Sequence, residues 1–212
     1  HNMAAMKALC DRAVLLDAGR VVADGPVDAI VDRYLGTGAA PVAQTVISDD
    51  AVRSGSGEAR FRSVELMTID GRPCGELYFG QRFRVRVTVE VIRPIAAAVA
   101  GVVIDALDGT SVASAFSTDR RAPPLALPSG WQVLEVDVDL HLLPRTYAIK
   151  LMLNRTDGYD IDVVQRTLDF IVMNVAETGG DSYPWGTVHG YVRAQAAWRG
   201  PAPVTPATPE SL

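Results

Sequence analysis

The sequence is poor in the residues and runs on which several classes of protein depend. Its 212 residues include only two cysteines, Cys10 and Cys74, so no disulfide framework is expected and a reducing compartment fits. The longest apolar run, 94–104, is too short to span a bilayer. The 20 basic and 25 acidic side chains give a net charge of −5, so overall charge does not favour binding to nucleic acid or to an anionic membrane.

Catalytic and metal-binding motifs are also missing. The two lysines, Lys7 and Lys150, do not form the Gly-Lys pair before Ser or Thr that a phosphate-binding P-loop needs. The three histidines, His1, His141 and His189, are widely separated, and no Cys or His pair has the spacing of metal ligands. The Gly-x-Ser-x-Gly motif of a nucleophile elbow does not occur. We therefore expect this chain to be no enzyme and to hold no cofactor and no metal.

Residues 58–198 have the alternation that is typical of β-strands. In 82–91 every second residue is apolar, which predicts a strand with one buried face. Asp-Gly pairs at 70–71 and 108–109 predict turns between such runs. Further strands are predicted at 132–140, 147–154, 167–175 and 187–198. No convincing helical stretch interrupts the series, so the fold class is mainly β, an antiparallel β-sandwich.

The acidic residues of this region have a structural interpretation and a catalytic alternative. Glu135, Asp137 and Asp139 fall on the polar side of the 132–140 strand, which explains them as a solvated face. Residues 154–162 do not follow a calcium-loop pattern and are interpreted as a solvated turn. A glycosidase pair can be assembled from these carboxylates together with those at 160 and 162. That alternative requires two carboxylates that converge on a cleft.

The sequence divides into four segments. Residues 1–36 have the pattern helix, hairpin (13–23), helix, and are too few to close a core of their own. The second helix begins at Pro26 and carries an apolar stripe of Val27, Ile30, Val31, Tyr34 and Leu35. Residues 37–57 are rich in Gly, Ala, Ser and Pro and are predicted to be a linker. The sandwich follows at 58–198. Residues 199–212, with four prolines, are predicted to be a disordered tail.

Polar and aromatic side chains of the sandwich suggest a binding surface for carbohydrate. Sugars are bound by forked hydrogen bonds together with aromatic stacking. The candidate polar contacts are Arg84, Arg86, Thr118, Asp119, Lys150 and Asn154. The candidate stacking residues are Trp131, Tyr159, Tyr183 and Trp185. For each of these residues the alternative is an ordinary solvated face with core or edge aromatics.

The first 35 residues resemble the end of an ATP-binding-cassette (ABC) ATPase domain. The resemblance rests on five short stretches in family order, namely 1–5, 9–13, 15–21, 24–26 and 34–35. In that family the leading histidine contacts the ATP γ-phosphate, and His1 stands at that place. The Walker motifs and the signature sequence are absent here, so the resemblance implies ATP and Mg²⁺ only for an intact parent protein.

Residues 58–198 resemble the C-terminal domain of Wzt-like ATPase subunits, which export O-antigen and related glycans. The resemblance rests on Val64 with 70–71, Gly80 before the 82–91 strand, 101–105 with 108–109, and an ending at 170–172 and 190–198. Residues 142–149 resemble the family's Leu-Leu-Pro-Gly-x-Tyr element. Arg145 stands where the family usually has glycine, which weakens the prediction of a tight turn there.

The resemblance implies a fold, a function and partners. The fold is an immunoglobulin-like sandwich after a helix–hairpin–helix remnant of the ATPase domain. The function is non-catalytic recognition of the exported polysaccharide, coupled to ATP-driven export. The location is the cytoplasmic side of a bacterial inner membrane, with a permease partner bound through the ATPase domain. A homodimer is implied, with 190–198 as the candidate exchanged strand. The alternative is a purely structural domain that dimerises the subunits and docks them on the permease.

Overall fold

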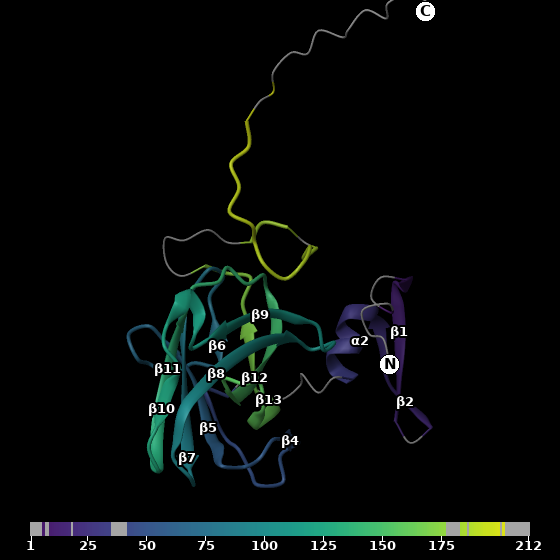
Figure 1. Cartoon of the computed structure of the whole chain (residues 1–212). Coiled ribbons are helices and arrows are strands. Elements are labelled where there is room, and N and C mark those ends of the chain that lie inside the picture. Colours follow the sequence, from purple (N-terminus) through teal and green to yellow (C-terminus); the bar gives the residue numbers. More distant parts are fainter. Residues whose placement is uncertain are drawn as a thin grey trace, which may run out of the picture.

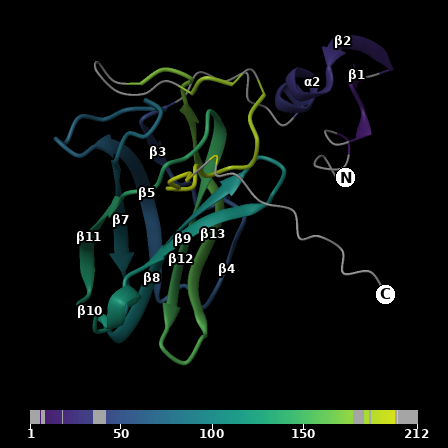
Figure 2. The same ribbon diagram turned by 90° about the horizontal axis from the view of Figure 1, so that it is seen from above.

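The computed structural model describes residues 6, 9–17, 19–34, 42–176, 183–185, 187–199 and 201. The chain is mainly β, and two mostly antiparallel sheets lie face to face as a sandwich, as the alternation predicted (Figure 1). Figure 2 shows the two layers from above, with β5, β7 and β11 in one and β8, β12 and β13 in the other. His1, the predicted switch histidine, lies outside the described residues, and so does most of the predicted disordered tail, 199–212.

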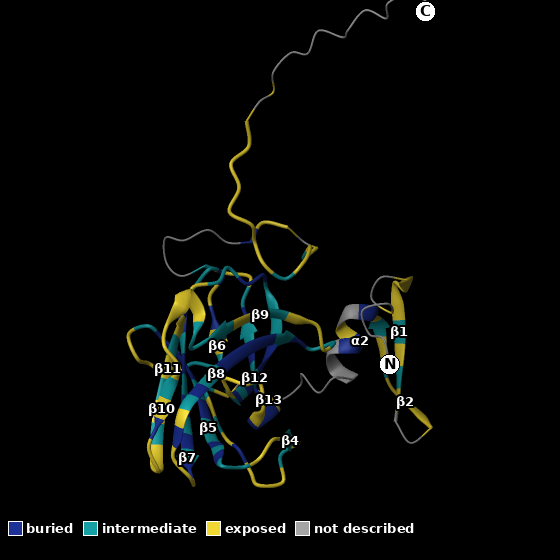
Figure 3. Cartoon of the chain, viewed as in Figure 1, coloured by how far each residue is buried: buried dark blue, intermediate teal, exposed yellow. Residues whose placement is uncertain are grey.

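The smaller sheet has four strands in the order β11-β7-β5-β3. The strands are β3 (Gln44–Val46), β5 (Ala59–Thr68), β7 (Phe83–Val91) and β11 (Gly130–Val138). The period of two in β7 is confirmed, because all five of its alternate apolar residues are buried, from Phe83 to Val91. Figure 3 shows how buried and exposed positions are distributed over the strands. The polar residues of β7 and β11 therefore form the outer face of this sheet.

The larger sheet has seven strands, with a main path β10-β8-β12-β13-β4. Its strands are β4 (Arg53–Ser54), β6 (Glu76–Leu77), β8 (Ile95–Ala106), β9 (Ser111–Phe116), β10 (Leu125–Leu127), β12 (Arg145–Arg155) and β13 (Asp160–Val172). β9 pairs with β8, and β6 pairs with β13 in parallel. A short 3₁₀ turn, η1 (Asp119–Arg121), follows β9.

Aromatic rings from both sheets fill the core between them. The ring of Phe170 lies 5.8 Å from that of Phe83 and 5.7 Å from that of Tyr147, measured between centroids. The Tyr147 hydroxyl oxygen lies within hydrogen-bond distance of the carbonyl oxygens of Leu143 (2.8 Å) and Tyr191 (2.9 Å), and its single proton can be donated to either. Because a buried hydroxyl needs a partner, this arrangement ties the chain near residue 191 to the sandwich.

The N-terminal segment forms the predicted hairpin and helix. β1 (Arg12–Asp17) pairs with β2 (Arg20–Pro26), and α2 (Val27–Tyr34) follows. Pro26 ends the second strand rather than beginning the helix. Val27, Ile30 and Val31 are buried, as the apolar stripe predicted.

The structure also corrects the predictions for residues 37–57 and 187–198. The predicted linker 37–57 includes β3 and β4, which pair with β5 and β13; both strands are too short to show a period of two. The strand predicted at 187–198 is reduced to a single bridge, Leu142 to Val192. The backbone N–H of Arg193 donates to His141 O (2.8 Å), and the described residues after it pair with no strand. The alternating pattern of 187–198 therefore does not form a strand, because no neighbouring strand pairs with it.

Gly55 occupies a position that only glycine fits. Its φ is +125°, and a Cβ there would lie 2.5 Å from the carbonyl oxygen of Ile161. We expect Gly55→Ala to lower the free energy of unfolding by about 2–3 kcal/mol in urea denaturation, because it combines backbone strain with a backbone clash. Gly71 is the matched control: its φ is +89° with nothing within 4 Å, so Gly71→Ala should cost about 1 kcal/mol. Equal losses would contradict this account.

Candidate functional site

The register of the strands places the predicted binding residues on opposite sides of the sandwich. Arg84 and Arg86 lie on β7, in the outer face of the four-stranded sheet. Lys150 and Asn154 lie on β12 and point outward from the seven-stranded sheet. One sheet face therefore cannot include all four residues. Sequence reasoning missed this division because alternation shows which residues share a strand face but not which strands share a sheet.

The outer face of the four-stranded sheet is built from cross-strand pairs. We name it the arginine face and define it by its outward side chains Arg62, Glu65, Arg84, Arg86, Thr88, Glu90, Trp131, Val133, Glu135 and Asp137. In this register Arg84 is opposite Asp137 and Arg86 is opposite Glu135. Opposite charges at directly facing positions stabilise an antiparallel pair.

Ion pairs fix the arginine side chains in place. Arg84 makes a forked contact with Asp137, with Nε 2.6 Å from Oδ1 and Nη2 3.1 Å from Oδ2. Arg86 donates from Nε to Glu135 Oε1 (2.6 Å) and from Nη1 to Glu65 Oε2 (3.4 Å). The planar guanidinium groups are thereby oriented, while the edges of the pairs stay accessible to solvent.

One of these ion pairs affects the protonation of its carboxylate. The hydrogen bond from Arg84 holds the pKa of Asp137 below its ordinary value, so this carboxyl stays ionised at neutral pH. Arg82 lies 3.4 Å from Asp139, and Glu135 is bound by Arg86. A glycosidase acid needs a raised pKa, whereas the pKa of Asp137 is lowered.

Trp131 supplies the exposed aromatic ring of the arginine face. It lies opposite Glu90 on the β11–β7 ladder, and 65 % of it is exposed. Glu90 is bound by Arg62, whose Nη2 lies 2.6 Å away. Val133, two residues along β11, is 59 % exposed on the same face. An exposed indole beside oriented charged groups presents both contacts that sugars use, C–H stacking and forked hydrogen bonding.

The residues on the other sheet lie apart from this surface. Asn154 donates to Asp160 Oδ1 (2.5 Å) beside the turn between β12 and β13. Tyr159, on that turn, is 73 % exposed. Asp119 accepts the backbone N–H of Phe116 (2.8 Å) and so closes the turn after β9, while Thr118 precedes η1 without a side-chain cap bond. The structure thus gives Asp119 a role in local folding.

The two remaining aromatic candidates differ from Trp131 in burial. Tyr183 is 9 % exposed and packs edge-on against Phe79, with ring centroids 5.7 Å apart. Its hydroxyl donates to Thr187 O (3.2 Å). Tyr183 is therefore a packing residue, whereas Trp185 is 67 % exposed.

Asp162 corrects the prediction of a solvated turn at 154–162. It points inward from β13, is 2 % exposed, and accepts the backbone N–H of Phe61 (2.8 Å). Arg53 approaches it at 3.4 Å. Desolvation raises the pKa of this carboxyl, and the Phe61 hydrogen bond and Arg53 oppose that rise. The hairpin places Asp162 opposite Leu153 on the inner face, a position that composition alone did not indicate.

Two kinds of feature are absent from the described part of the chain. No group of three or more His, Cys, Asp or Glu side chains there has the arrangement of a metal site. No helix among those residues has the length and apolar character needed to cross a membrane.

Comparisons with known proteins point to one family. The model of the Wzt C-terminal domain matches residues 50–193. Among solved structures, the chain is similar to a crystal structure of the C-terminal domain of Wzt, with 15 % identity, a TM-score of 0.59, and coverage of 72 % of this chain and 90 % of that one.

Other solved structures share less of the fold. A β-glucosidase from Listeria innocua has 14 % identity and a TM-score of 0.34, over 56 % of this chain and 17 % of that one. A CARDB domain from Pyrococcus furiosus has 14 % identity and a TM-score of 0.33, over 58 % of this chain and all of that one. Neither likeness supports an inference about this chain. No curated protein matched.

Proposed function

Because the chain belongs to the Wzt C-terminal domain family, a C-terminal domain of polysaccharide ABC exporters, we propose that its sandwich binds the exported glycan on the arginine face. The observation that carries this proposal is the exposed ring of Trp131 on the same sheet face as the ion-paired Arg84 and Arg86. The domain acts without catalysis: it selects an O-antigen-like polysaccharide for an exporter that its parent subunit drives by hydrolysing ATP with Mg²⁺.

The arginine face suits a polyhydroxylated ligand for a physical reason. Each arginine has more donors than its carboxylate partners use, and each carboxylate oxygen keeps a free lone pair. A sugar with vicinal hydroxyls can therefore donate to Glu135 or Asp137 and accept from Arg84 or Arg86 without breaking the pairs. Since the ion pairs already fix the side chains, little conformational entropy is lost on binding.

The proposed partners are a second copy of the chain and a membrane permease. Residues 190–193 attach to the sandwich through Leu143 N–H to Tyr191 O (2.8 Å) and through the bridge to Val192. The described residues that follow, 194–198, are exposed, and Trp198 is 97 % exposed. Exchange of this segment between two copies would cover that ring. The permease is reached through the ATPase domain, at the cytoplasmic face of a bacterial inner membrane.

Calorimetric titration of the whole chain with the native polysaccharide of the source cell tests the proposal. We expect saturable binding that Arg86→Ala weakens by about tenfold or more, since a hydrogen bond to a charged group contributes about 1.5–3 kcal/mol. Lys150→Ala, on the outer face of the other sheet, is the matched control and should leave the affinity unchanged. Circular dichroism checks that both variants are folded.

A folded chain that fails to bind a polysaccharide with intact chain ends would contradict the proposal. The structural alternative, dimerisation and docking of the subunits, would then account for the domain. Binding that Lys150→Ala weakens and Arg86→Ala does not would move the site to the outer face of the seven-stranded sheet.

A further inference from the structure

The sandwich contains a cavity of about 170 Å³ at one edge. It lies between the two sheets, where β11, an edge strand of the four-stranded sheet, faces β8, β9 and β10. It is partly open to solvent. Leu134 and Val136 point inward from β11 yet remain partly exposed, which fits an opening at this edge.

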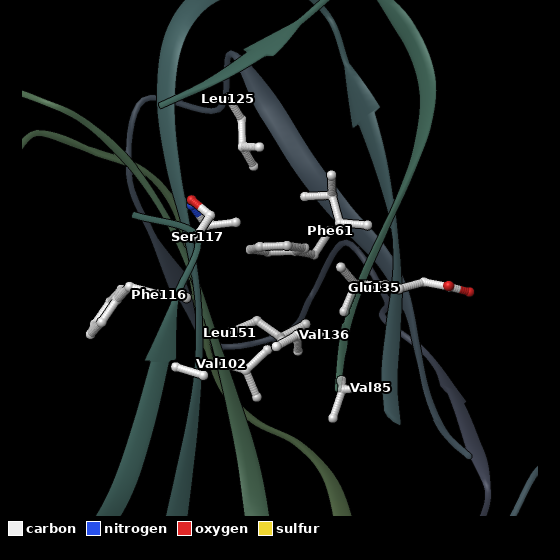
Figure 4. Close-up of a pocket in the computed structure, with 14 residues that line it drawn as sticks. Phe61, Val85, Val102, Phe116, Ser117, Leu125, Glu135, Val136 and Leu151 are labelled. Atoms are coloured by element: carbon white, nitrogen blue, oxygen red, sulfur yellow. The ribbon is translucent and has the colours of Figure 1, made fainter. Parts of the chain in front are cut away.

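The wall of the cavity is almost entirely apolar. Figure 4 shows Phe61 in its middle, with Leu125 on one side and Leu151 and Val136 on the other. Glu135 contributes to the wall, but its carboxylate points away from the space, toward the arginine face (Figure 4). Ser117 supplies a polar side chain to the wall. Its oxygen accepts the backbone N–H of Ala100 (3.0 Å), and this bond does not use the hydroxyl proton.

A space of this size and lining differs from ordinary packing defects. Protein interiors contain few voids larger than a water molecule. An apolar cavity offers water too few hydrogen-bonding partners, and an engineered cavity of about 150 Å³ lined by Leu, Ile and Phe stays dry and binds benzene. The cavity here is similar in volume and in the character of its wall, and it has an opening through which a ligand can enter.

We propose that this cavity is a binding site for an apolar group about the size of a six-carbon ring, with the polar end of the ligand toward Ser117 and solvent. The group is either a small free molecule or a hydrocarbon substituent on a larger polar ligand. In the second case the inference deepens the proposed function and rests on it: β11 borders both the cavity and the arginine face, so a glycan on that face can turn an apolar substituent into the cavity.

Binding of benzene to the whole chain tests the site itself, apart from any glycan. Methyl NMR of Val85, Val102, Leu134 and Leu151 should show saturable shifts. Ala115→Leu, which extends a side chain into the cavity from β9, should weaken binding by at least tenfold. Ala113→Leu is the matched control, two residues away on the same inward side of β9 but outside the wall, and it should bind as the original chain does. Ala100→Val is a second cavity-filling variant if Ala115→Leu does not fold.

Titration with hexyl and methyl β-D-glucoside separates the two sources of the apolar group. Binding of benzene and of the hexyl but not the methyl glucoside, with both interactions abolished by Ala115→Leu, indicates a substituent on a sugar. Binding of benzene but of neither glucoside indicates a free molecule. Benzene that causes no saturable shift overturns the proposal, as does binding that both cavity-filling variants leave intact. These results are independent of whether polysaccharide binding depends on Arg86, so failure here is distinguishable from failure of the proposed function.

Discussion

Replacing Asp162 with alanine is expected to lower the free energy of unfolding by about 3–5 kcal/mol, because removing one member of a buried ion pair leaves the other charge uncompensated. The Arg53 side chain is 10 % exposed and that of Asp162 is 2 % exposed, so water cannot replace the lost carboxylate freely. The backbone N–H of Phe61 also loses its acceptor, 2.8 Å away. Urea denaturation followed by circular dichroism measures the loss.

Two further variants separate the contributions at this site. Asp162→Asn keeps an oxygen that can accept from Phe61, so it should cost less than Asp162→Ala. Asp160→Ala removes an exposed carboxylate on the same strand and should change stability by about 0.5 kcal/mol or less. A loss for Asp162→Ala no larger than that for Asp160→Ala would contradict the buried pair.

Burial also gives Asp162 a characteristic pH dependence. Its folded-state pKa is raised, so between the unfolded and folded pKa values the folded chain binds more protons than the unfolded chain. The contribution of this group to stability is therefore largest below the unfolded pKa and decreases as pH rises through the folded pKa. Relative to Asp162→Asn, which does not titrate, the original chain should gain stability as the pH falls from 7 toward 4.

Replacing Trp131 with alanine is expected to weaken binding of the polysaccharide by tenfold or more. Covering about 60 Å² of the indole with the apolar face of a sugar is worth about 1.5 kcal/mol at about 25 cal/mol per Å². The ring is 65 % exposed in the free chain, so its removal should leave the fold intact. Calorimetric titration of the variant with the native polysaccharide measures the effect.

Tyr159→Ala provides the matched control for the tryptophan. Tyr159 is also an exposed aromatic residue, at 73 %, but it lies on the turn between β12 and β13 of the other sheet. Its replacement should leave the affinity unchanged. Equal losses for the two variants, or a loss for Tyr159→Ala alone, would contradict stacking on the arginine face.

The sequence alone predicted the elements whose residues alternate over a long run. β7 has nine residues with one fully buried side, so its period of two was unambiguous. The hairpin of β1 and β2 was recognisable from two short apolar runs on either side of a turn at residues 18–19. The buried stripe of α2 was recognisable from apolar residues three and four positions apart. β3 and β4 have three and two residues, too few for any period to appear, and they were mistaken for linker.

The composition of the candidate site could be predicted only in part. Arg84 and Arg86 were identified as outward residues because they alternate with buried valines. Their carboxylate partners Glu135 and Asp137 lie about 50 residues away in sequence, and only the β7–β11 register brings them together. Similarly, the inward position of Asp162 follows from pairing between β12 and β13 rather than from local sequence.

The central claim is that the arginine face binds the exported polysaccharide, and an NMR titration of the whole chain with that polysaccharide tests it most directly. The account predicts that the indole N–H signal of Trp131 and the guanidinium signals of Arg84 and Arg86 shift together and saturate at one ligand concentration. It also predicts that the signals of Lys150 and Asn154, on the opposite side of the sandwich, stay in place. Shifts confined to Lys150 and Asn154, or no saturable shift at all, would contradict it.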